Sequence, residues 1–314
     1  MKNMADTFAP IMITTLCRYE HFKRCIESLV RNTYADRTEL YIGLDYPLKE
    51  SHWEGYRKIK EYVYTITGFK QVYVFERERN YGARENYWAL RREIEKKYDC
   101  IIITEDDNEF SPCFLDFMNK ALVKYWDEER VRTVGAYLGE EFEGIKQAGT
   151  IFTYSNTAWG AGVWKHKDIA FPPDEYYQGI INDRRRSWKL FSTTPGCWVM
   201  LYRMVKRGLS FGDVKRESYN CMNDTFQVRP YTSLVRNWGN DGSGIHCVTD
   251  NARFISVDIL DCKYFDELPD CEVTLSVPRV RMIFQNLPSR KTLRGWLVLG
   301  KYSLIFLKVF LVGK

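Results

Sequence analysis

Three consecutive acidic residues, Glu105-Asp106-Asp107, follow the strongly apolar segment 100–104. Carboxylates this close repel one another, and a neighbouring cation compensates the repulsion. Hard divalent cations take oxygen ligands and share their coordination with phosphates. A metal that bridges these acids and a diphosphate would assist the departure of a nucleoside diphosphate as a Lewis acid. The alternative is an acidic helix N-cap, a role for which Asp106 or Asp107 would be ordinary residues.

The segments that would position these acids alternate in type along the first half of the chain. Apolar runs predict strands, and helical spacing of apolar residues predicts helices between them. The strands are expected at 10–15, 40–44, 72–75, 100–104 and 132–138, and the helices at 22–30, 52–66, 84–97 and 114–126. This alternation predicts an α/β protein with a mostly parallel sheet, helices on both faces and right-handed crossovers.

Polar residues fall where the predicted strands end. Arg18, Asp45 and Asn80 follow the first three strands, and the acidic triplet follows the fourth. In open α/β sheets, ligands bind at the carboxyl ends of the strands, where the strand order reverses. We therefore expect these side chains to surround one binding site.

From residue 150 onward the alternation breaks, and tryptophan and glycine become frequent. No long linker and no internal repeat separates this half from the first. We expect a first unit at 1–130, a mixed second half at 131–288 packed on it, and a C-terminal segment at 289–314.

The composition, 45% hydrophobic and 28% charged, is that of a globular protein with a core. Aromatic residues reach 15%, which suits sugar binding because pyranose C–H faces stack on rings, although a tyrosine-rich core and surface is the simpler explanation of this value. A net charge of +5 without a dense basic stripe argues against a nucleic-acid partner.

The nine cysteines form no CxxC pair, which argues against a zinc ribbon or a disulfide framework. Scattered cysteines fit a reducing cytoplasm. Residues 1–7 contain no apolar h-region, so no signal peptide is expected, and we predict a cytoplasmic protein.

The C-terminal segment 290–314 combines basic residues with tryptophan and leucine. Lysines interrupt its apolar run, which makes it a poor membrane-spanning helix. Two interpretations stay open: an interfacial helix that holds the protein peripherally on an anionic membrane, or a helix packed on the domain. A short basic run, Arg184-Arg185-Arg186, is read as a solvated turn, with an acceptor-phosphate or membrane contact as the second interpretation.

The first 125 residues resemble the nucleotide-sugar half of a GT-A-fold glycosyltransferase of the broad family 2 type. The features that carry the resemblance are Thr14-Thr15-x-x-Arg18, Asp45, Asn80-x-Gly82-x-Arg84-x-Asn86 and Glu105-Asp106-Asp107 in place of the usual DxD motif. The Glu-Asp-Asp form, followed by Asn-Glu-Phe-Ser-Pro112, is more narrowly similar to the N-acetylglucosaminyltransferase I type. The resemblance implies a GT-A, Rossmann-like fold and a metal-dependent transfer from a nucleotide sugar.

The resemblance also implies roles for single residues. Asp107 would bind Mn²⁺ or Mg²⁺ directly, while Glu105 and Asp106 would face the sugar and the ribose. Asp45 would accept a hydrogen bond from a uracil ring, and Arg18 would lie near the pyrophosphate, with Thr15, Asn80 and Arg84 completing the donor site. UDP is favoured on this ground, with GDP and dTDP open.

Each of these assignments has a structural alternative. Arg18 could pair with Glu20 or Asp45, Asp45 could cap the turn at Tyr46-Pro47, and Asn80 with Gly82 could simply form a turn.

Two stretches of the second half resemble parts of the same enzymes. Trp159-Gly160-Ala-Gly-Val-Trp164 is similar to a segment that lines the donor sugar and the acceptor, and its alternative is a tight turn between packed tryptophans. The stretch 233–246, with Gly242, Ser243 and His246, looks like a loop that closes over the donor and excludes water. His246 could equally be a buried, satisfied histidine.

An inverting transfer needs one general base to deprotonate the acceptor hydroxyl. Asp213, in Phe211-Gly-Asp213-Val214, resembles the base motif of the N-acetylglucosaminyltransferase I type, with valine where tryptophan is expected. Asp183 and Glu217 are the rival candidates.

The expected function is an inverting glycosyltransferase that acts on a saccharide or lipid-linked acceptor in surface polysaccharide assembly. A nucleotidyltransferase would also hold a nucleotide and a metal, but it would want a glycine-rich basic loop after the first strand, where this chain has Thr15-Leu-Cys-Arg18. A non-catalytic carbohydrate-binding protein is the third possibility, and it would not need the three carboxylates.

Overall fold

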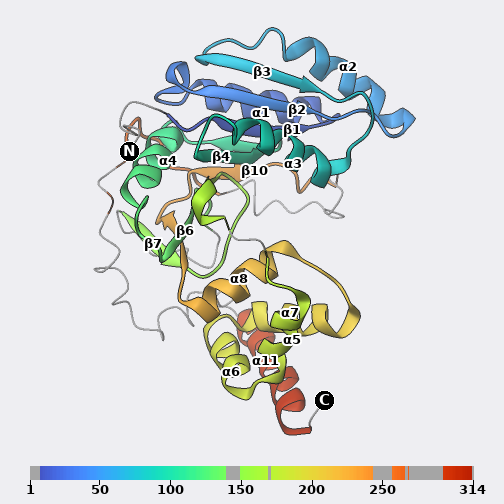
Figure 1. The fold of residues 1–314 in the computed structure, drawn as a ribbon, viewed down its shortest axis with the longest axis vertical. Coiled ribbons are helices and arrows are strands. Elements are labelled where there is room, and N and C mark those ends of the chain that lie inside the picture. The colour runs from blue at the N-terminus through green and yellow to red at the C-terminus, as the bar shows by residue number, and fades with distance from the viewer. Residues whose placement is uncertain are drawn as a thin grey trace.

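A computed structural model of the protein describes residues 8–138, 149–168, 171–242, 257–265, 268 and 293–312. Two layers are visible in Figure 1: a twisted sheet flanked by helices, and a group of helices beyond one end of the sheet. Ser243 and His246 lie outside the described residues, as do residues 289–292 of the C-terminal segment.

The sheet has eight strands in the order β3-β2-β1-β4-β8-β6-β9-β7. The strands are β1 (Ile11–Thr15), β2 (Glu39–Leu44), β3 (Gln71–Glu76), β4 (Cys100–Glu105), β6 (Val131–Gly135), β7 (Thr150–Thr153), β8 (Ala161–Trp164) and β9 (Phe226–Pro230). The first four are parallel, as the alternation predicts. From β1 the chain moves outward to β2 and β3 and then returns to β4 on the other side of β1. The point where the strand order reverses therefore lies between β1 and β4.

Helices cover both faces of the parallel part, and the strand residues alternate between them. Ile11 and Ile13 of β1 pack in one cluster with α1 (Tyr19–Val30), α2 (Trp53–Tyr62) and α4 (Phe114–Lys124). Met12 packs on the other face with α3 (Gly82–Ile94). A period of two places successive side chains on opposite faces, so a strand buried on both sides is apolar throughout.

The second half of the sheet is mixed, as expected. Strand β8 runs antiparallel to β4 and β6, β9 is parallel to β6, and β7 is antiparallel to β9. A separate two-stranded ribbon pairs β5 (Asn108–Phe110) with β10 (Val235–Asn237) in antiparallel fashion. This ribbon matters for the site, because β5 begins directly after the acidic triplet.

A helical group that the sequence did not predict follows β8. It contains α5 (Asp174–Asn182), α6 (Arg184–Thr193), α7 (Pro195–Arg207) and α8 (Gly212–Asn223). Helix α6 begins at Arg184, with Asp183 as its N-cap, so the interpretation of the Arg184-Arg185-Arg186 run as a turn is wrong. Ser, Thr and Asp are common N-cap residues, and Asp183 before the arginine run indicates the start of this helix.

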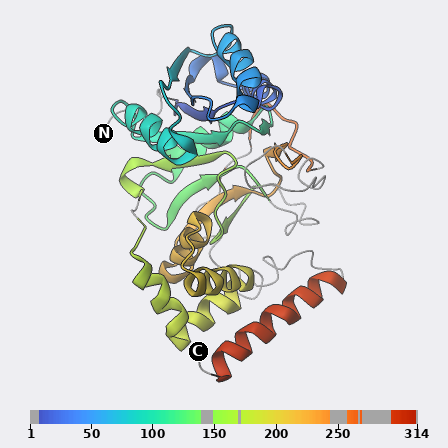
Figure 2. The same cartoon turned by 90° about the vertical axis from the view of Figure 1, so that its right-hand side faces the viewer.

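The C-terminal helix α11 (Leu293–Val312) packs on this group (Figure 2). The ring of Phe306 is buried, and it stacks on Phe191 of α6 with a centroid separation of 4.2 Å and meets Trp198 of α7 at 4.9 Å. One face of α11 thus packs on the helical group. None of the described helices is long and apolar enough to cross a bilayer.

No pair of the described cysteines is bridged: residues 17, 25, 100, 113, 197, 221 and 262 are all free thiols.

Phe306→Ala should destabilise the protein by about 3 kcal/mol, because it leaves a cavity between α6, α7 and α11. The free energy of unfolding in urea measures the effect. Leu307→Ala, at the neighbouring exposed position, is the matched control and should change stability by less than about 0.5 kcal/mol. Equal losses in the two variants would mean that α11 is not packed through Phe306.

Candidate functional site

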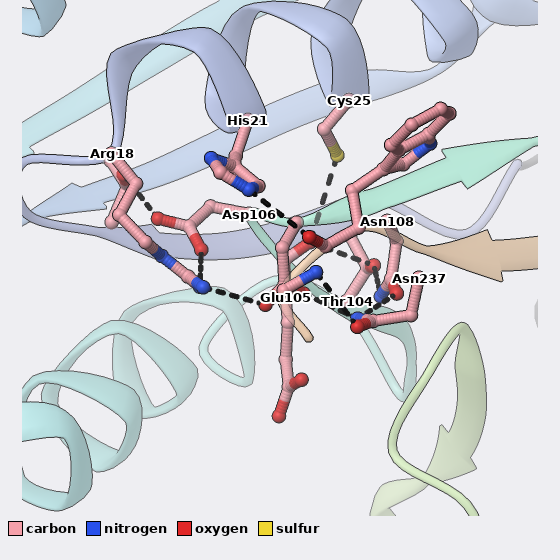
Figure 3. Close-up of polar contacts among 12 residues, drawn as sticks. Arg18, His21, Cys25, Thr104, Glu105, Asp106, Asn108 and Asn237 are labelled. Atoms are coloured by element: carbon pink, nitrogen blue, oxygen red, sulfur yellow. Dashed lines mark hydrogen bonds and ion pairs between the residues drawn. The ribbon is translucent and has the colours of Figure 1, made fainter. Parts of the chain in front are cut away.

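The ends of β1 and β4 meet at the switch in strand order, and an arginine joins them (Figure 3). Register pairs Thr14 with Glu105, which places Thr15 beside Asp106, and the Thr15 hydroxyl donates to Asp106 Oδ2 at 2.8 Å. Arg18, the N-cap of α1, forms an ion pair with Asp106 and a second one with Asp107 at 2.8 Å. The predicted convergence of the first and fourth strand ends is therefore found.

These pairs correct two of the sequence interpretations. Arg18 pairs with neither Glu20 nor Asp45 but with the two aspartates of the triplet. The N-cap alternative for the triplet is wrong as well, because strand β5 follows Asp107 and the next helix, α4, begins only at Phe114.

The second half of the chain covers Asp107 through β10. Asn237 donates its side-chain amide to Asp107 Oδ1 at 2.7 Å and to the side chain of Asn108 at 2.9 Å. The backbone N–H of Trp238 donates to the carbonyl of Asp107 at 2.8 Å. Arg18 and Asn237 thus bind one oxygen each of the Asp107 carboxylate, and both aspartates of the triplet are buried.

Gly239 fits against Asp107 only because it has no side chain. A Cβ at this position would lie 2.0 Å from Asp107 Oδ2 and 3.1 Å from Arg18 Nη1. The stretch 233–246 was expected to approach a donor; in the described part, its backbone approaches the acidic triplet itself. Sequence reasoning assigned no role to Asn237 or Gly239, and the only signal was their place in this glycine-rich stretch.

More residues of α1 hold the same loop. His21 Nε2 lies 3.2 Å from the carbonyl of Trp238 and 3.1 Å from a carboxylate oxygen of Asp241. Arg24 lies over the Trp238 ring at 4.1 Å. The loop after β10 is therefore fastened to the helix that follows β1, and no spacing in the sequence indicates that contact.

Arg18 neutralises only part of the charge at this edge. Although burial alone would lower it, the charges of Asp106 and Asp107 raise the pKa of Arg18, so the guanidinium stays positive. Withdrawal from water and then the charges of Asp107 and Asp106 raise the pKa of Glu105 to about 7, against the opposing effect of Arg18. The edge as a whole thus remains electronegative.

Glu105 is the most solvent-accessible acid of the triplet, although the surrounding protein partly desolvates its carboxylate, and it points away from the Arg18–Asp106 pair (Figure 3). Trp159 Nε1 donates to Glu105 Oε2 at 3.1 Å, which brings the tryptophan segment of the second half to the strand end. Gly160 adopts a positive φ of 68°, and a Cβ there would lie 2.9 Å from the Phe114 ring. This segment is therefore both a tight turn and a neighbour of the acidic triplet.

Asp45 and Asn80 tie the ends of β2 and β3 together. Asp45 Oδ1 accepts the backbone N–H of Tyr46 at 2.9 Å and that of Tyr81 at 2.8 Å, and the Asn80 amide donates to the carbonyl of Tyr46 at 2.6 Å. The capping interpretation of Asp45 is confirmed, because its carboxylate accepts the N–H of Tyr46, whereas Gly82 is the first residue of α3 and forms no turn with Asn80. A binding role for Asp45 and Asn80 stays a prediction.

The remaining predicted residues do not belong to this network. Arg84 is exposed in the first turn of α3, and Gly242 is exposed with a φ of 85°. Asp213 is exposed in the first turn of α8, near Arg216. Its rival Asp183 is occupied as an N-cap that accepts from Arg186 N at 2.8 Å.

In the described part of the chain, no three His, Cys, Asp or Glu side chains come together as ligands. Protein side chains alone therefore form no metal site there. Asp107 could serve as one ligand, with the others coming from a bound diphosphate and water. Two aspartates share one guanidinium, and the negative charge left over fits a cation here, while the Arg18 contact on Asp107 Oδ2 limits direct access to that oxygen.

Comparisons with known proteins give weak likenesses only. No family model matches the chain, and no curated protein matches it by sequence. The crystal structure of S. aureus TarS matches with 16% identity and a TM-score of 0.35 over 53% of this chain and 30% of that chain. The crystal structure of S. aureus TarS 1-349 matches with 12% identity and a TM-score of 0.37 over 69% and 72%. The chain thus spans less than a third of the longer TarS chain, and likeness at these scores carries no argument about activity.

Gly239→Ala should disrupt the junction of the two halves, because its methyl group overlaps Asp107 Oδ2. We expect a loss of about 1–3 kcal/mol in the free energy of unfolding, the usual cost of overpacking. Gly300→Ala on α11, where nothing lies within 4 Å of the added carbon, is the control and should be neutral or stabilising. Wild-type stability of Gly239→Ala would show that the loop does not rest on Asp107.

Proposed function

We propose that this protein is a glycosyltransferase that moves a sugar from a nucleotide sugar to a hydroxyl of a saccharide or lipid-linked acceptor, with inversion at the anomeric carbon. One observation carries the proposal: Thr15, Arg18 and the acidic triplet meet between β1 and β4, where the strand order reverses. That point is where open α/β sheets bind nucleotides.

Different residues around this point would bind different parts of the donor. Asp45 and Asn80, at the ends of β2 and β3, lie on the side where the nucleobase would bind, and Asp45 Oδ2 accepts from the Asn80 amide at a long 3.4 Å. Arg18 lies beside the place for the diphosphate. Glu105, exposed and next to Trp159, lies on the side of the second half, where the transferred sugar would meet the acceptor. UDP is the proposed nucleotide.

The charge balance favours a donor that arrives with a cation. The single charge of Arg18 is already shared by Asp106 and Asp107, so a diphosphate at this edge would meet net negative charge. We propose Mn²⁺ or Mg²⁺ with Asp107 as its protein ligand. When bound, such an ion would stabilise the charge that develops on the leaving diphosphate.

The chain must also supply a base for the acceptor. In the proposed step the acceptor oxygen attacks the anomeric carbon, the bond from that carbon to the diphosphate oxygen breaks, and the hydroxyl proton passes to a carboxylate. Asp213 is the proposed base. It is exposed and has no hydrogen-bonding role in the helical group, in contrast to Asp183.

A cytoplasmic role in the assembly of a surface polysaccharide or glycan is the corresponding biological proposal. The free thiols of the described residues suit that compartment.

Asp107→Asn should abolish the response of the protein to a nucleotide with metal. UDP together with Mn²⁺ should raise the melting temperature of the wild type by mass action, and more than UDP or Mn²⁺ alone. The amide supplies no negative charge for the cation, so the joint shift should disappear and transfer should fall about a hundredfold or more.

Glu20→Gln, an exposed acid in the first turn of α1, is the control and should behave as the wild type. A wild type whose melting temperature responds to none of UDP, GDP and dTDP, with or without Mn²⁺, would contradict the proposal. Release of pyrophosphate instead of a nucleoside diphosphate would reassign the protein as a nucleotidyltransferase, and nucleotide-independent sugar binding would reassign it as a carbohydrate-binding protein.

Asp213→Asn should lower kcat by about a hundredfold while the shift in melting temperature caused by the donor stays unchanged, because a base acts in the transition state. Steady-state kinetics with the acceptor that the enzyme uses separates kcat from KM. Asp174→Asn, an exposed acid in the first turn of α5, is the control. An unchanged kcat in Asp213→Asn would transfer the role to another carboxylate, with Glu217 next in line.

A further inference from the structure

Three helices at this end of the molecule, α6 and α7 of the helical group and the α11 packed on it, are free of acidic residues. Helix α6 has four basic residues, α7 has three and α11 has three, and none of the three contains Asp or Glu. The whole chain is close to balance, with 46 basic and 41 acidic residues, so this asymmetry is local. The other two helices of the group differ, since α5 contains Asp174 and Glu175 and α8 contains Asp213 and Glu217.

Helix α11 has two different long sides. Its inner side carries the buried ring of Phe306. Its outer side carries Leu297, Leu304 and Leu307, which are 65%, 69% and 47% exposed, with the exposed Lys301 and Lys308 among them. Positions 297, 301, 304 and 308 are spaced by four, three and four residues, which aligns them along one face. The packed and the surface-binding interpretations of this segment are therefore compatible.

Helix α6 lies beside α11 and adds exposed side chains next to it. Trp188 of α6 is 56% exposed, yet its ring lies 5.8 Å from that of Phe306. Arg184 lies over the Phe310 ring at 5.3 Å. An exposed tryptophan and an arginine of α6 thus contact Phe306 and Phe310 of α11, at the end of the molecule away from the parallel strands (Figures 1 and 2).

We propose that this face, which we call the α6–α11 face, binds the surface of an anionic lipid membrane. It consists of Trp188 and Arg184 with Leu297, Lys301, Leu304, Leu307 and Lys308. Exposed leucines and a tryptophan beside lysines are the composition of helices that lie in the interface of a bilayer, with the apolar side chains in the acyl boundary. Lysine side chains then extend toward anionic headgroups.

Charge distinguishes this occupant from a second copy of the chain. Two copies meeting through this face would bring together lysines and arginines without any acidic partner from α6, α7 or α11. An anionic lipid surface supplies the missing negative charge at every position. The proposal does not rest on the glycosyltransferase assignment, because no residue of the donor site takes part.

Vesicle co-sedimentation of the full chain tests the proposal. The wild type should sediment with phosphatidylcholine vesicles that contain phosphatidylglycerol and remain in solution with pure phosphatidylcholine. Lys301→Glu/Lys308→Glu should lower the partition coefficient about tenfold or more, since each basic residue near such a surface contributes about fivefold. Deletion of the segment is unsuitable, because it would expose Phe191 and Trp198.

Lys58→Glu/Arg92→Glu is the matched control, with the same change in net charge on the exposed sides of α2 and α3. It should sediment with the vesicles as the wild type does. Equal loss in both double variants would overturn the proposal, because it would indicate attraction by net charge alone. Leu304→Gln/Leu307→Gln should also weaken binding; full retention there, with displacement by soluble polyphosphate, would mean a polyanion surface and would overturn the membrane assignment.

Failure of this proposal is separable from failure of the proposed function. Wild-type melting-temperature shifts with UDP and Mn²⁺ in Lys301→Glu/Lys308→Glu would show an intact donor site in a protein that no longer binds vesicles. Unchanged unfolding in urea would show that the inner side of α11 still packs.

Discussion

The ion pairs of Arg18 with Asp106 and Asp107 hold together the parts of the chain that make the candidate site. Arg18 is the N-cap of the helix after β1, and the aspartates follow β4. Asn237 of β10 and Gly239 just after it reach the Asp107 carboxylate. Burying two carboxylates costs solvation, and the cost is offset only where hydrogen bonds and an opposite charge are in place. Thr15, Arg18 and Asn237 supply them, so the junction depends on all of these side chains at once.

This arrangement gives the three acids of the triplet different environments. Asp106 and Asp107 are buried under a shared guanidinium, whereas Glu105 remains exposed and its pKa is raised to about 7. The crowding of negative charge is thus divided between an internal ion pair and a surface acid. A single positive charge cannot cancel three carboxylates, and the edge keeps the negative potential that a divalent cation would offset.

The two ends of the molecule differ in the sign of their charge. At the strand edge, acidic residues exceed the basic ones, while α6, α7 and α11 carry basic residues only. The helical group is held together by aromatic packing around Phe306, Trp198 and Phe191, which leaves its charged side chains to the surface. At the helical end, the basic side chains therefore lie on the surface and are not part of the aromatic core.

The sequence by itself determined the first half of the fold. Apolar runs such as 100–104 are read as buried strands because a parallel strand is covered on both faces, and the ends of these strands predicted which polar residues converge. The helices at 174–223 were not predicted from the sequence. Charged and small residues interrupt their apolar spacing, and packing against neighbouring helices stabilises them. Of the helices at this end of the molecule, only the C-terminal one was expected.

Only the tertiary structure decided how the acidic triplet is compensated. Arg18 lies more than eighty residues from Asp106, and Asn237 lies 130 residues from Asp107, so no local pattern links them. Strand order and the pairing of β5 with β10 bring them together. The types of the site residues are a property of the sequence, whereas their partners depend on contacts between distant segments, which only the folded chain brings about.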